Sequence, residues 1–190
     1  GHRRKLSPRA QYNLTLGALL HDIGKLGVPE SILLKPERER TAEDQEFYRL
    51  HTSLGERILQ PIESLAGALP FVRQHHERRD GSGYPRGSVA RHLAPEIELL
   101  AAANAYDMAR ATYPRNAAAQ AEALREEGRA GRFEPALVEE IIRSGERLAA
   151  AGTLPTIEDL LPVPEIDPGG RILVADDNST NRQLYRELLS

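Results

Sequence analysis

Cysteine and tryptophan are missing from this chain of 190 residues, and aromatic residues make up 5% of it. Without cysteine, the chain forms neither disulfides nor thiolate metal sites, which suits a reducing cytoplasm. No apolar run approaches the roughly 18 residues of a membrane helix, and no signal peptide is present in the sequence. The net charge of -3 provides no basic excess for DNA binding. These absences favour a cytoplasmic protein that contacts neither membranes nor DNA.

The residues that are abundant favour helices. Alanine, leucine, glutamate and arginine dominate the sequence, and 40% of the residues are apolar, which is enough for a core. Residues 1–150 are therefore predicted to form an all-α helical bundle. Proline and glycine crowd into residues 151–170, which predicts a semi-stiff linker. Residues 171–190 change character again and are predicted to form a separate β-α fragment.

Several helix starts can be read within the predicted bundle. Thr41 to Asp44 resembles a capping box with aspartate in place of glutamate. Pro95 and Pro135 suit the first turns of two later helices. After the capping box, apolar residues recur at helical spacing and predict a core-facing stripe with His51 beside it, pointing inward. The stripe consists of Phe47, Leu50, Leu54 and Ile58.

Four of the six histidines fall into a pattern with one aspartate: His21-Asp22, His51 and His75-His76. Neutral imidazole and carboxylate are ligands of first-row transition metals. Because a carboxylate has two oxygens, Asp22 can bridge two ions while His21 binds one. An isolated His-Asp pair is usually incidental. The three groups together predict a metal site.

Two features beside the histidines suit phosphate chemistry. Lys25 is predicted on the same helix face as Asp22, where its ammonium can neutralise charge that grows on a phosphate. Residues 77–85 form a charged loop in which glycines permit close approach of the backbone to a ligand. Arg78 offers a planar donor fork and Tyr84 a stacking face. Taken alone, this loop also fits an ordinary surface turn.

These segments resemble the HD-GYP family, a branch of the HD phosphohydrolases. The resemblance covers roughly residues 10 to 145 and rests on His21-Asp22-Ile23-Gly24-Lys25, Val28-Pro29, Leu34-Lys35-Pro36, His51 with Gly55, and His75-His76-Glu77-Arg78 through Gly83-Tyr84-Pro85. It implies a helical bundle that holds two or three divalent metal ions, iron first with manganese as the substitute. It also implies hydrolysis of the bacterial messenger cyclic di-GMP to pGpG or GMP.

The resemblance assigns roles by position. Asp22 and Lys25 would be catalytic, with Asp22 bridging two ions. The metal ligands would be His21, Asp22, His51, His75 and His76, with Asn104 at the sixth position. The substrate-binding residues would be Lys25, Arg78, Asp80, Gly83, Tyr84, Pro85, Arg110 and Arg115. Other signalling proteins are expected as partners through the 77–85 loop, and a homodimer is a further expectation.

The chain departs from the family pattern in three places. Asn104 stands where the family has a metal-binding aspartate, and an amide oxygen is the weaker donor. Tyr113 replaces an arginine of the family, a loss that Arg110 or Arg115 could offset. The family's longer first helix, with a further histidine, has no match here, so a truncated N-terminal helix is expected. A catalytically degenerate module that senses cyclic di-GMP or docks a partner therefore stays open. A general HD nucleotide phosphohydrolase is less favoured because of the Gly-Tyr-Pro loop.

The tail suggests a second family. Residues 171–175 are a short apolar run suited to a buried strand, and Asp176-Asp177 follows it. This resembles the first strand and helix of a response-regulator receiver domain, whose acidic pair helps to hold magnesium. The family's phospho-acceptor aspartate lies on a later strand, so this fragment is expected to accept no phosphate. A fortuitous strand-helix pair is the alternative.

Overall fold

The computed structural model describes residues 6–151, and the regular elements of this part are all helices. The α-helices are α1 (Pro8–Leu20), α2 (Glu30–Leu33), α3 (Ala42–Arg49), α4 (His51–Leu59), α5 (Leu69–Gln74), α6 (Pro95–Thr112), α7 (Ala117–Arg129) and α8 (Pro135–Ala151). Four short 3-10 helices connect them: η2 (Ile23–Gly27), η3 (Glu37–Glu39), η4 (Glu63–Leu65) and η5 (Ala90–His92). The all-α prediction is thus confirmed for this part of the chain. The receiver-like fragment and the linker beyond residue 151 lie outside it.

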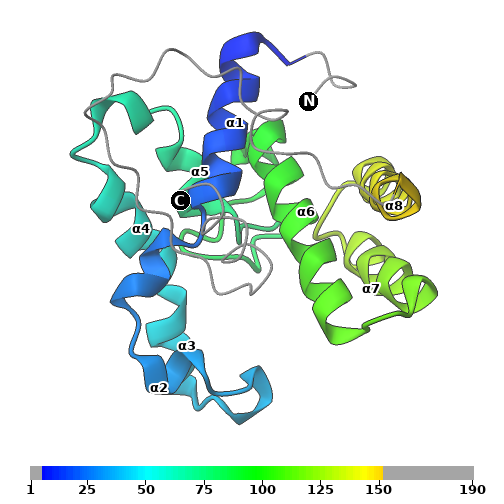
Figure 1. The fold of residues 1–190 in the computed structure, drawn as a ribbon, viewed down its shortest axis with the longest axis horizontal. Helices are drawn as coiled ribbons and strands as arrows, with labels where there is room; N and C mark the ends of the chain where they lie inside the picture. The colour runs from blue at the N-terminus through cyan, green and yellow to red at the C-terminus, as the bar shows by residue number, and fades with distance from the viewer. Residues whose placement is uncertain (1–5, 152–190) are drawn as a thin grey trace.

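The N-terminal half gathers α1, η2, α4 and α5 on one side of the molecule (Figure 1). Glycines permit the close crossings between these elements. A Cβ on Gly24 would lie 1.8 Å from the carbonyl oxygen of His51, and a Cβ on Gly17 would lie 2.3 Å from Cβ of Phe71. Only hydrogen fits at these two positions, so η2 is held directly against the start of α4.

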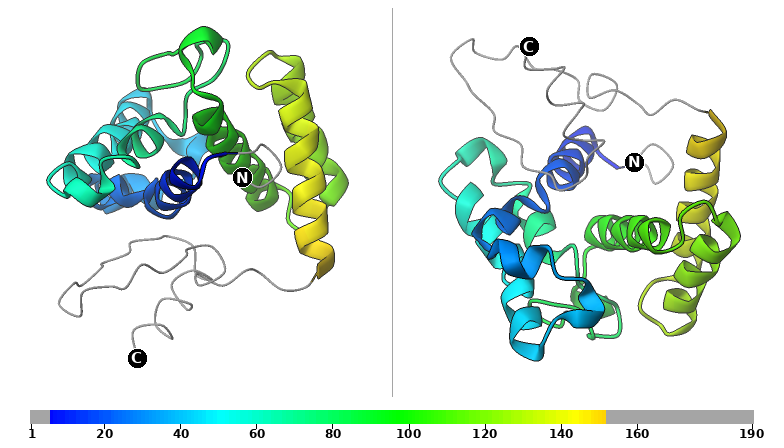
Figure 2. Two further views of the ribbon diagram at one scale, coloured as in Figure 1. Left: turned by 90° about the horizontal axis from the view of Figure 1, so that it is seen from above. Right: turned by 60° about the horizontal axis from the view of Figure 1, so that its bottom comes forward.

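The C-terminal half is a hairpin of α7 and α8 packed on the long helix α6 (Figure 2). As predicted, α6 begins at Pro95 and α8 at Pro135. The largest apolar cluster lies here and includes Tyr106, Phe133 and Leu137. A smaller cluster of Phe71 and Leu93 with residues of α6 joins this half to α5.

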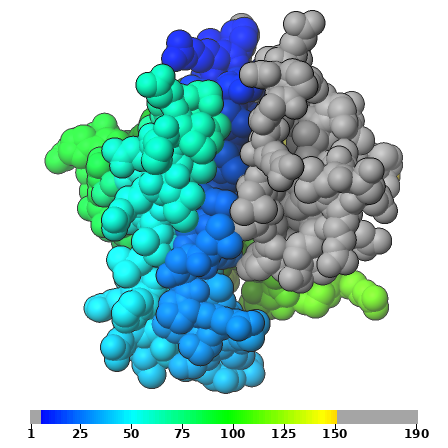
Figure 3. All heavy atoms as spheres, turned by 60° about the vertical axis from the view of Figure 1, so that its left-hand side comes forward, coloured from blue at the N-terminus to red at the C-terminus, as the bar shows by residue number. Residues whose placement is uncertain are grey.

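The predicted capping box is present, because the Thr41 hydroxyl accepts from the Asp44 amide while the Asp44 carboxylate accepts from the Thr41 amide. The expectation of a core-facing apolar stripe is wrong. The predicted helix is divided at Leu50 into α3 and α4, and Phe47, Leu50 and Ile58 are 45%, 49% and 42% exposed. The prediction that His51 points inward is confirmed, because its side chain is fully buried at the start of α4. Figure 3 shows the face on which α3 and α4 (cyan) run beside α1 and η2 (blue).

Within residues 6–151, no helix has both the length and the apolar character needed to cross a bilayer.

Candidate metal centre

Three imidazoles of the centre are oriented by the ends of helices. His21 directly follows α1, and its Nδ1 lies 2.8 Å from the Ala18 carbonyl oxygen. His51 follows the end of α3, with Nδ1 2.6 Å from the Tyr48 carbonyl oxygen. His75 follows α5, with Nδ1 2.8 Å from the Val72 carbonyl oxygen. Each ring therefore hydrogen-bonds a carbonyl in the last turn of the preceding helix.

These hydrogen bonds fix the tautomer. A carbonyl oxygen only accepts, so each Nδ1 carries the hydrogen, and the neutral rings of His51 and His75 present the lone pair of Nε2. The Nε2 atoms of His51 and His75 lie 3.3 Å apart in the interior. A cation between two lone pairs that face each other at this distance would relieve their repulsion. Two nitrogens bound to one ion at about 2.1 Å lie about 2.9–3.4 Å apart, which fits the observed separation.

Asp22 lies between the imidazoles and exposes its two oxygens to different neighbours. Its Oδ1 is 3.6 Å from Nε2 of His51 and 3.8 Å from Nε2 of His75. Its Oδ2 is 3.3 Å from Nε2 of His21 and 2.7 Å from Nζ of Lys25. One carboxylate thus serves two groups of nitrogen donors, the arrangement that a bridging ligand requires.

The ligand atoms form two sets in which all atoms lie within 4.8 Å of one another. One set is His51, His75 and His76, and the other is His21, Asp22 and His75. Imidazole nitrogens with a shared carboxylate are a donor set that suits divalent first-row metals such as iron and manganese. The residues present therefore fit divalent metal binding.

Burial and mutual charge set the protonation of the centre. Burial lowers the pKa of His51, and with neighbouring imidazoles it holds the pKa values of His75 and His76 well below the usual range. Burial also opposes ionisation of Asp22, but the hydrogen bond from His21, with the charges of His21 and Lys25, keeps its pKa far below normal. At His21 burial lowers the pKa, yet the hydrogen bond to Asp22 and its charge outweigh burial and raise it.

These directions leave His51, His75 and His76 neutral and Asp22 ionised. Neutral imidazole and ionised carboxylate are the forms that bind cations, so metal binding needs no deprotonation of these four groups. His21 differs, because its raised pKa strengthens the competition of protons with an ion at this ring.

The loop after His76 closes over the centre. The Tyr84 ring stacks on the His76 ring, with centroids 4.6 Å apart, and the Tyr84 amide donates to the His76 carbonyl. The Tyr84–Pro85 peptide bond is cis. A Cβ on Gly83 would lie 2.4 Å from the Arg78 amide nitrogen, so only glycine allows this closure. Burial raises the pKa of Tyr84, whose hydroxyl stays protonated.

Glu77, which the sequence interpretation gave no role, anchors the far side of this loop. Its side chain is fully buried, and its two oxygens accept the amides of Arg86 and Ser88 at 2.8 Å each. Asp80 shapes the loop tip, because one of its oxygens accepts both the amide and the hydroxyl of Ser82. The loop is therefore held by carboxylates at two points.

The other predicted site residues lie elsewhere. Arg78 points away from solvent, with its guanidinium 4.6 Å from the Phe133 ring centroid and its Nε 3.7 Å from Glu127. Arg110 is exposed on α6 and lies 3.6 Å from Asp107, and Arg115 follows that helix with φ of 65°. Asn104 is half-buried on α6, and no hydrogen bond joins it to the histidines in the described part of the chain. The roles predicted for these four residues stay predictions.

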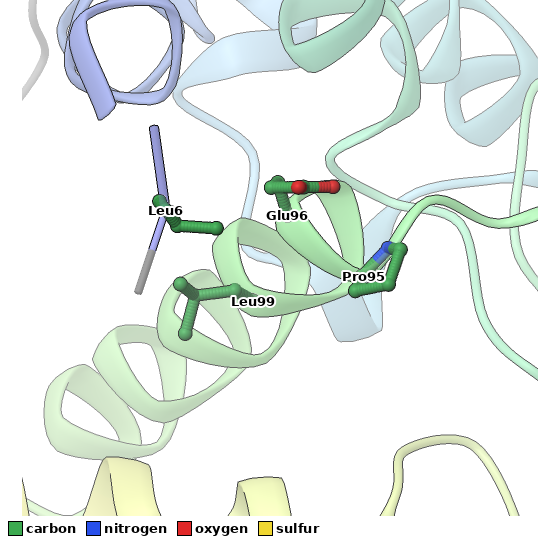
Figure 4. Close-up of a pocket in the computed structure, with 4 residues that line it drawn as sticks. All are labelled: Leu6, Pro95, Glu96 and Leu99. Atoms are coloured by element: carbon green, nitrogen blue, oxygen red, sulfur yellow. The ribbon is translucent and has the colours of Figure 1, made fainter. Parts of the chain in front are cut away.

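A separate pocket of about 340 Å³ lies between Leu6, two residues before α1, and the start of α6 (Figure 4). It is lined by Leu6, Pro95, Glu96 and Leu99. His21 follows the other end of α1, roughly 20 Å away for a helix of this length. The lining offers a single carboxylate and no histidine, so the pocket is no part of the metal centre.

Comparisons with known proteins agree with this geometry. A profile of the HD domain family matches residues 1–137. A cyclic di-GMP phosphodiesterase of Thermotoga maritima is 39% identical over 137 residues, which are 68% of this chain and 36% of that protein. A 3'3'-cGAMP-specific phosphodiesterase of Vibrio cholerae is 36% identical over 105 residues, which are 55% of this chain and 23% of that protein.

A solved structure described as Bd1817, an HDG"Y"P protein from Bdellovibrio bacteriovorus, is also similar. It has a TM-score of 0.57 and 26% sequence identity, and the match covers 70% of this chain and 43% of that chain. The chain spans about a third of the length of the Thermotoga relative and about a quarter of the Vibrio relative.

Proposed function

The chain belongs to the HD domain family, and from this premise we propose that it is a metal-dependent phosphodiesterase that hydrolyses cyclic di-GMP to pGpG or GMP. The observation that carries the proposal is Asp22, whose two oxygens face His51 with His75 on one side and His21 on the other. A carboxylate shared by two donor sets suits a pair of ions that clamps a phosphodiester. The name of the Thermotoga relative supports cyclic di-GMP as the substrate.

The protein residues have three tasks in this reaction. Divalent ions, when bound, lower the pKa of water and polarise phosphoryl oxygens. His21, Asp22, His51, His75 and His76 hold and orient them, and the helix-end carbonyls fix the rings so that little reorganisation is needed. Lys25 places a cation beside Asp22, where it stabilises charge that develops on the phosphate. The packed rings of His76 and Tyr84 exclude bulk water from one side.

The identity and number of the ions are part of the proposal. We propose iron, with manganese as the substitute, because imidazole and carboxylate donors suit both. We propose two ions because the two oxygens of Asp22 face different imidazoles; His75, which belongs to both sets, would bind only one of the ions through Nε2. A third ion would need further ligands outside these sets.

A second function is favoured by Asn104. If this amide replaces a carboxylate ligand, the centre binds metal more weakly, and the domain acts as a sensor of cyclic di-GMP without turnover. The 77–85 loop would then present the bound state to another signalling protein. We further propose that residues 171–190 begin a receiver-like segment that accepts no phosphate, that the protein acts in the cytoplasm, and that it forms a homodimer.

Elemental analysis and turnover assays separate the two functions. The protein is loaded anaerobically with iron or manganese and incubated with cyclic di-GMP, and with 3',3'-cGAMP as the competing substrate that the Vibrio relative suggests. About two ions per chain together with formation of pGpG or GMP is the result that the phosphodiesterase proposal expects. Metal-free protein that still binds cyclic di-GMP would establish the sensor instead, and selective cleavage of 3',3'-cGAMP would replace the proposed substrate.

The role of Asn104 has its own test. Asn104→Asp should raise metal occupancy and turnover if the side chain faces the ions, because a carboxylate is a stronger donor than an amide. Asp107→Asn, an exposed change one helical turn away, is the matched control. Unchanged occupancy in Asn104→Asp would remove this residue from the ligand set.

A further inference from the structure

Two arginines beside the metal centre contact tyrosine rings and have no carboxylate partner in residues 6–151. Many arginine side chains in the described residues pair with carboxylates, for example Arg73 with Glu56 and Arg79 with Glu98. Arg40 and Arg49 have no carboxylate within ion-pair distance in residues 6–151. Each instead lies over a tyrosine ring next to the centre.

Arg49 ends a stack that leads into the centre. Its guanidinium carbon lies 5.2 Å from the centroid of the Tyr84 ring, and Tyr84 in turn stacks on His76. Arg49 is exposed to solvent, whereas His76 is 7% exposed. The stack therefore runs from the protein surface to a metal ligand.

Arg40 occupies the corresponding place on the other tyrosine. Its guanidinium carbon lies 4.0 Å from the Tyr48 ring centroid, and Tyr48 lies 5.1 Å, centroid to centroid, from His51. One N–H of Arg40 donates to the Ile32 carbonyl at 3.3 Å, which fixes the plane of the guanidinium. Lys25 also lies 5.9 Å from the Tyr48 ring, so this tyrosine is bordered by two cations.

We propose that Arg40 and Arg49, held on Tyr48 and Tyr84, are the specificity-determining residues that bind the second phosphate and the guanine edges of the cyclic dinucleotide. The inference rests on the proposed function, because it assigns the part of the same substrate that the metal centre leaves unbound. A guanidinium stacked on an aromatic ring keeps its in-plane N–H donors available at the ring edge. Those donors match phosphate oxygens and the O6 and N7 atoms of guanine in bidentate geometry.

The charge pattern agrees with this assignment. A cyclic dinucleotide carries two phosphodiesters, and Lys25 with the metal ligands accounts for one of them. The second brings a negative charge that needs a counter-charge outside the centre, and arginines without carboxylate partners provide it. The Tyr48 and Tyr84 rings lie 5.1 and 6.3 Å from the His51 ring, so both arginine–tyrosine pairs flank the same imidazole.

The test compares two substrates in metal-loaded protein. Arg40→Ala, Arg49→Ala and the two lysine variants are assayed on cyclic di-GMP and on bis(p-nitrophenyl) phosphate, which has one phosphodiester and no purine. Each alanine variant should raise the KM for cyclic di-GMP roughly tenfold or more, since a charge-assisted hydrogen bond is lost. The loss in kcat/KM should be about tenfold greater for cyclic di-GMP than for the small diester, at unchanged metal content. The lysine variants should recover only part of the loss, because lysine keeps the charge without the planar fork.

The outcomes are distinguishable from failure of the proposed function. Arg38→Ala, which changes a side chain that is 85% exposed and lies near Glu39, is the matched control and should not alter either substrate's kinetics. Wild-type turnover of cyclic di-GMP with unchanged KM in both alanine variants would overturn the inference alone. Equal losses on both substrates, or lost metal, would show a structural role and overturn it as well. Wild-type protein that neither binds nor cleaves cyclic di-GMP would overturn both proposals together.

Discussion

The two halves of the molecule bury different chemistry. Around α1, η2, α4 and α5, the fully buried side chains include His51, His75, Thr52 and Glu77, beside an apolar cluster of four residues. Around α6, α7 and α8, the core is an apolar cluster of nine residues. The interior of the first half positions side chains that can bind metal, whereas the interior of the second half consists of apolar side chains that stabilise the fold. The stability of the α6–α8 half should therefore depend less on metal binding than the stability of the half that holds the donors.

The physical basis of this difference is desolvation. Burial lowers the pKa values of His51, His75 and His76, because the interior stabilises their charged forms less than water does. Their neutral rings still lose hydration, and a bound cation compensates for that loss. Apolar side chains in the other half need no such compensation.

The largest expected effect is the loss of the shared carboxylate. Asp22→Ala should remove nearly all bound metal and reduce turnover at least 100-fold, because the carboxylate oxygens that face His21 and His51 are both lost. Asp107→Ala, at an exposed position on α6, is the control and should keep the metal. Elemental analysis beside circular dichroism measures this, and a folded Asp22→Ala protein with full metal occupancy would refute the bridging role.

The next effect belongs to the apolar half. Phe133→Ala should lower the free energy of unfolding by about 3–5 kcal/mol, since Phe133 is 1% exposed in the larger core. Phe47→Ala, at a ring that is 45% exposed, should cost far less, about 1 kcal/mol at most. Urea denaturation of both variants measures the two costs. Equal losses of unfolding free energy in the two variants would contradict the exposed position of the Phe47 ring.

Removing the metal should sharpen the contrast between the halves. A ligand at 100 times its Kd stabilises the folded state by about 2.7 kcal/mol, so chelation should lower the Tm by the corresponding amount. Hydrogen exchange should accelerate first in α4 and α5, whereas the amides of α6 to α8 should keep their protection. Uniform acceleration throughout residues 6–151 would contradict the division into a donor half and an apolar half.

The smallest effect is expected at the surface of the hairpin. Arg125 donates to Glu139 at 2.7 and 3.1 Å, which joins α7 to α8 at the surface, where the two side chains are 39% and 41% exposed. Arg125→Ala should shift the Tm too little to measure, because exposed ion pairs are screened and entropically costly. A clear drop in Tm would show that surface charge, and not the apolar cluster, holds this half together.

The sequence predicted the donors better than it predicted their surroundings. The His-Asp and His-His pairs are contiguous in the chain, so a local pattern was sufficient to propose them as ligands. The carbonyls that orient His21, His51 and His75 depend on where helices end, and helix ends are the least reliable part of a sequence interpretation.

Other features depend on tertiary packing alone. Glu77 accepts hydrogen bonds from amides that lie nine and eleven residues further along the chain. The Arg40–Tyr48 and Arg49–Tyr84 contacts likewise join separate segments of the chain. Periodicity misplaced the stripe that contains Phe47 and Leu50, because the predicted helix is broken between α3 and α4. Local spacing carries no information about such a break.

The central claim is that Asp22, His51 and His75 meet around divalent cations. Anomalous diffraction at the iron edge, from crystals of anaerobically loaded protein, tests it most directly. The account predicts two peaks, one within coordination distance of Nε2 of His51 and one near Nε2 of His21, with an oxygen of Asp22 at each. Peaks elsewhere on the protein, or none beside these side chains at full iron loading, would contradict it.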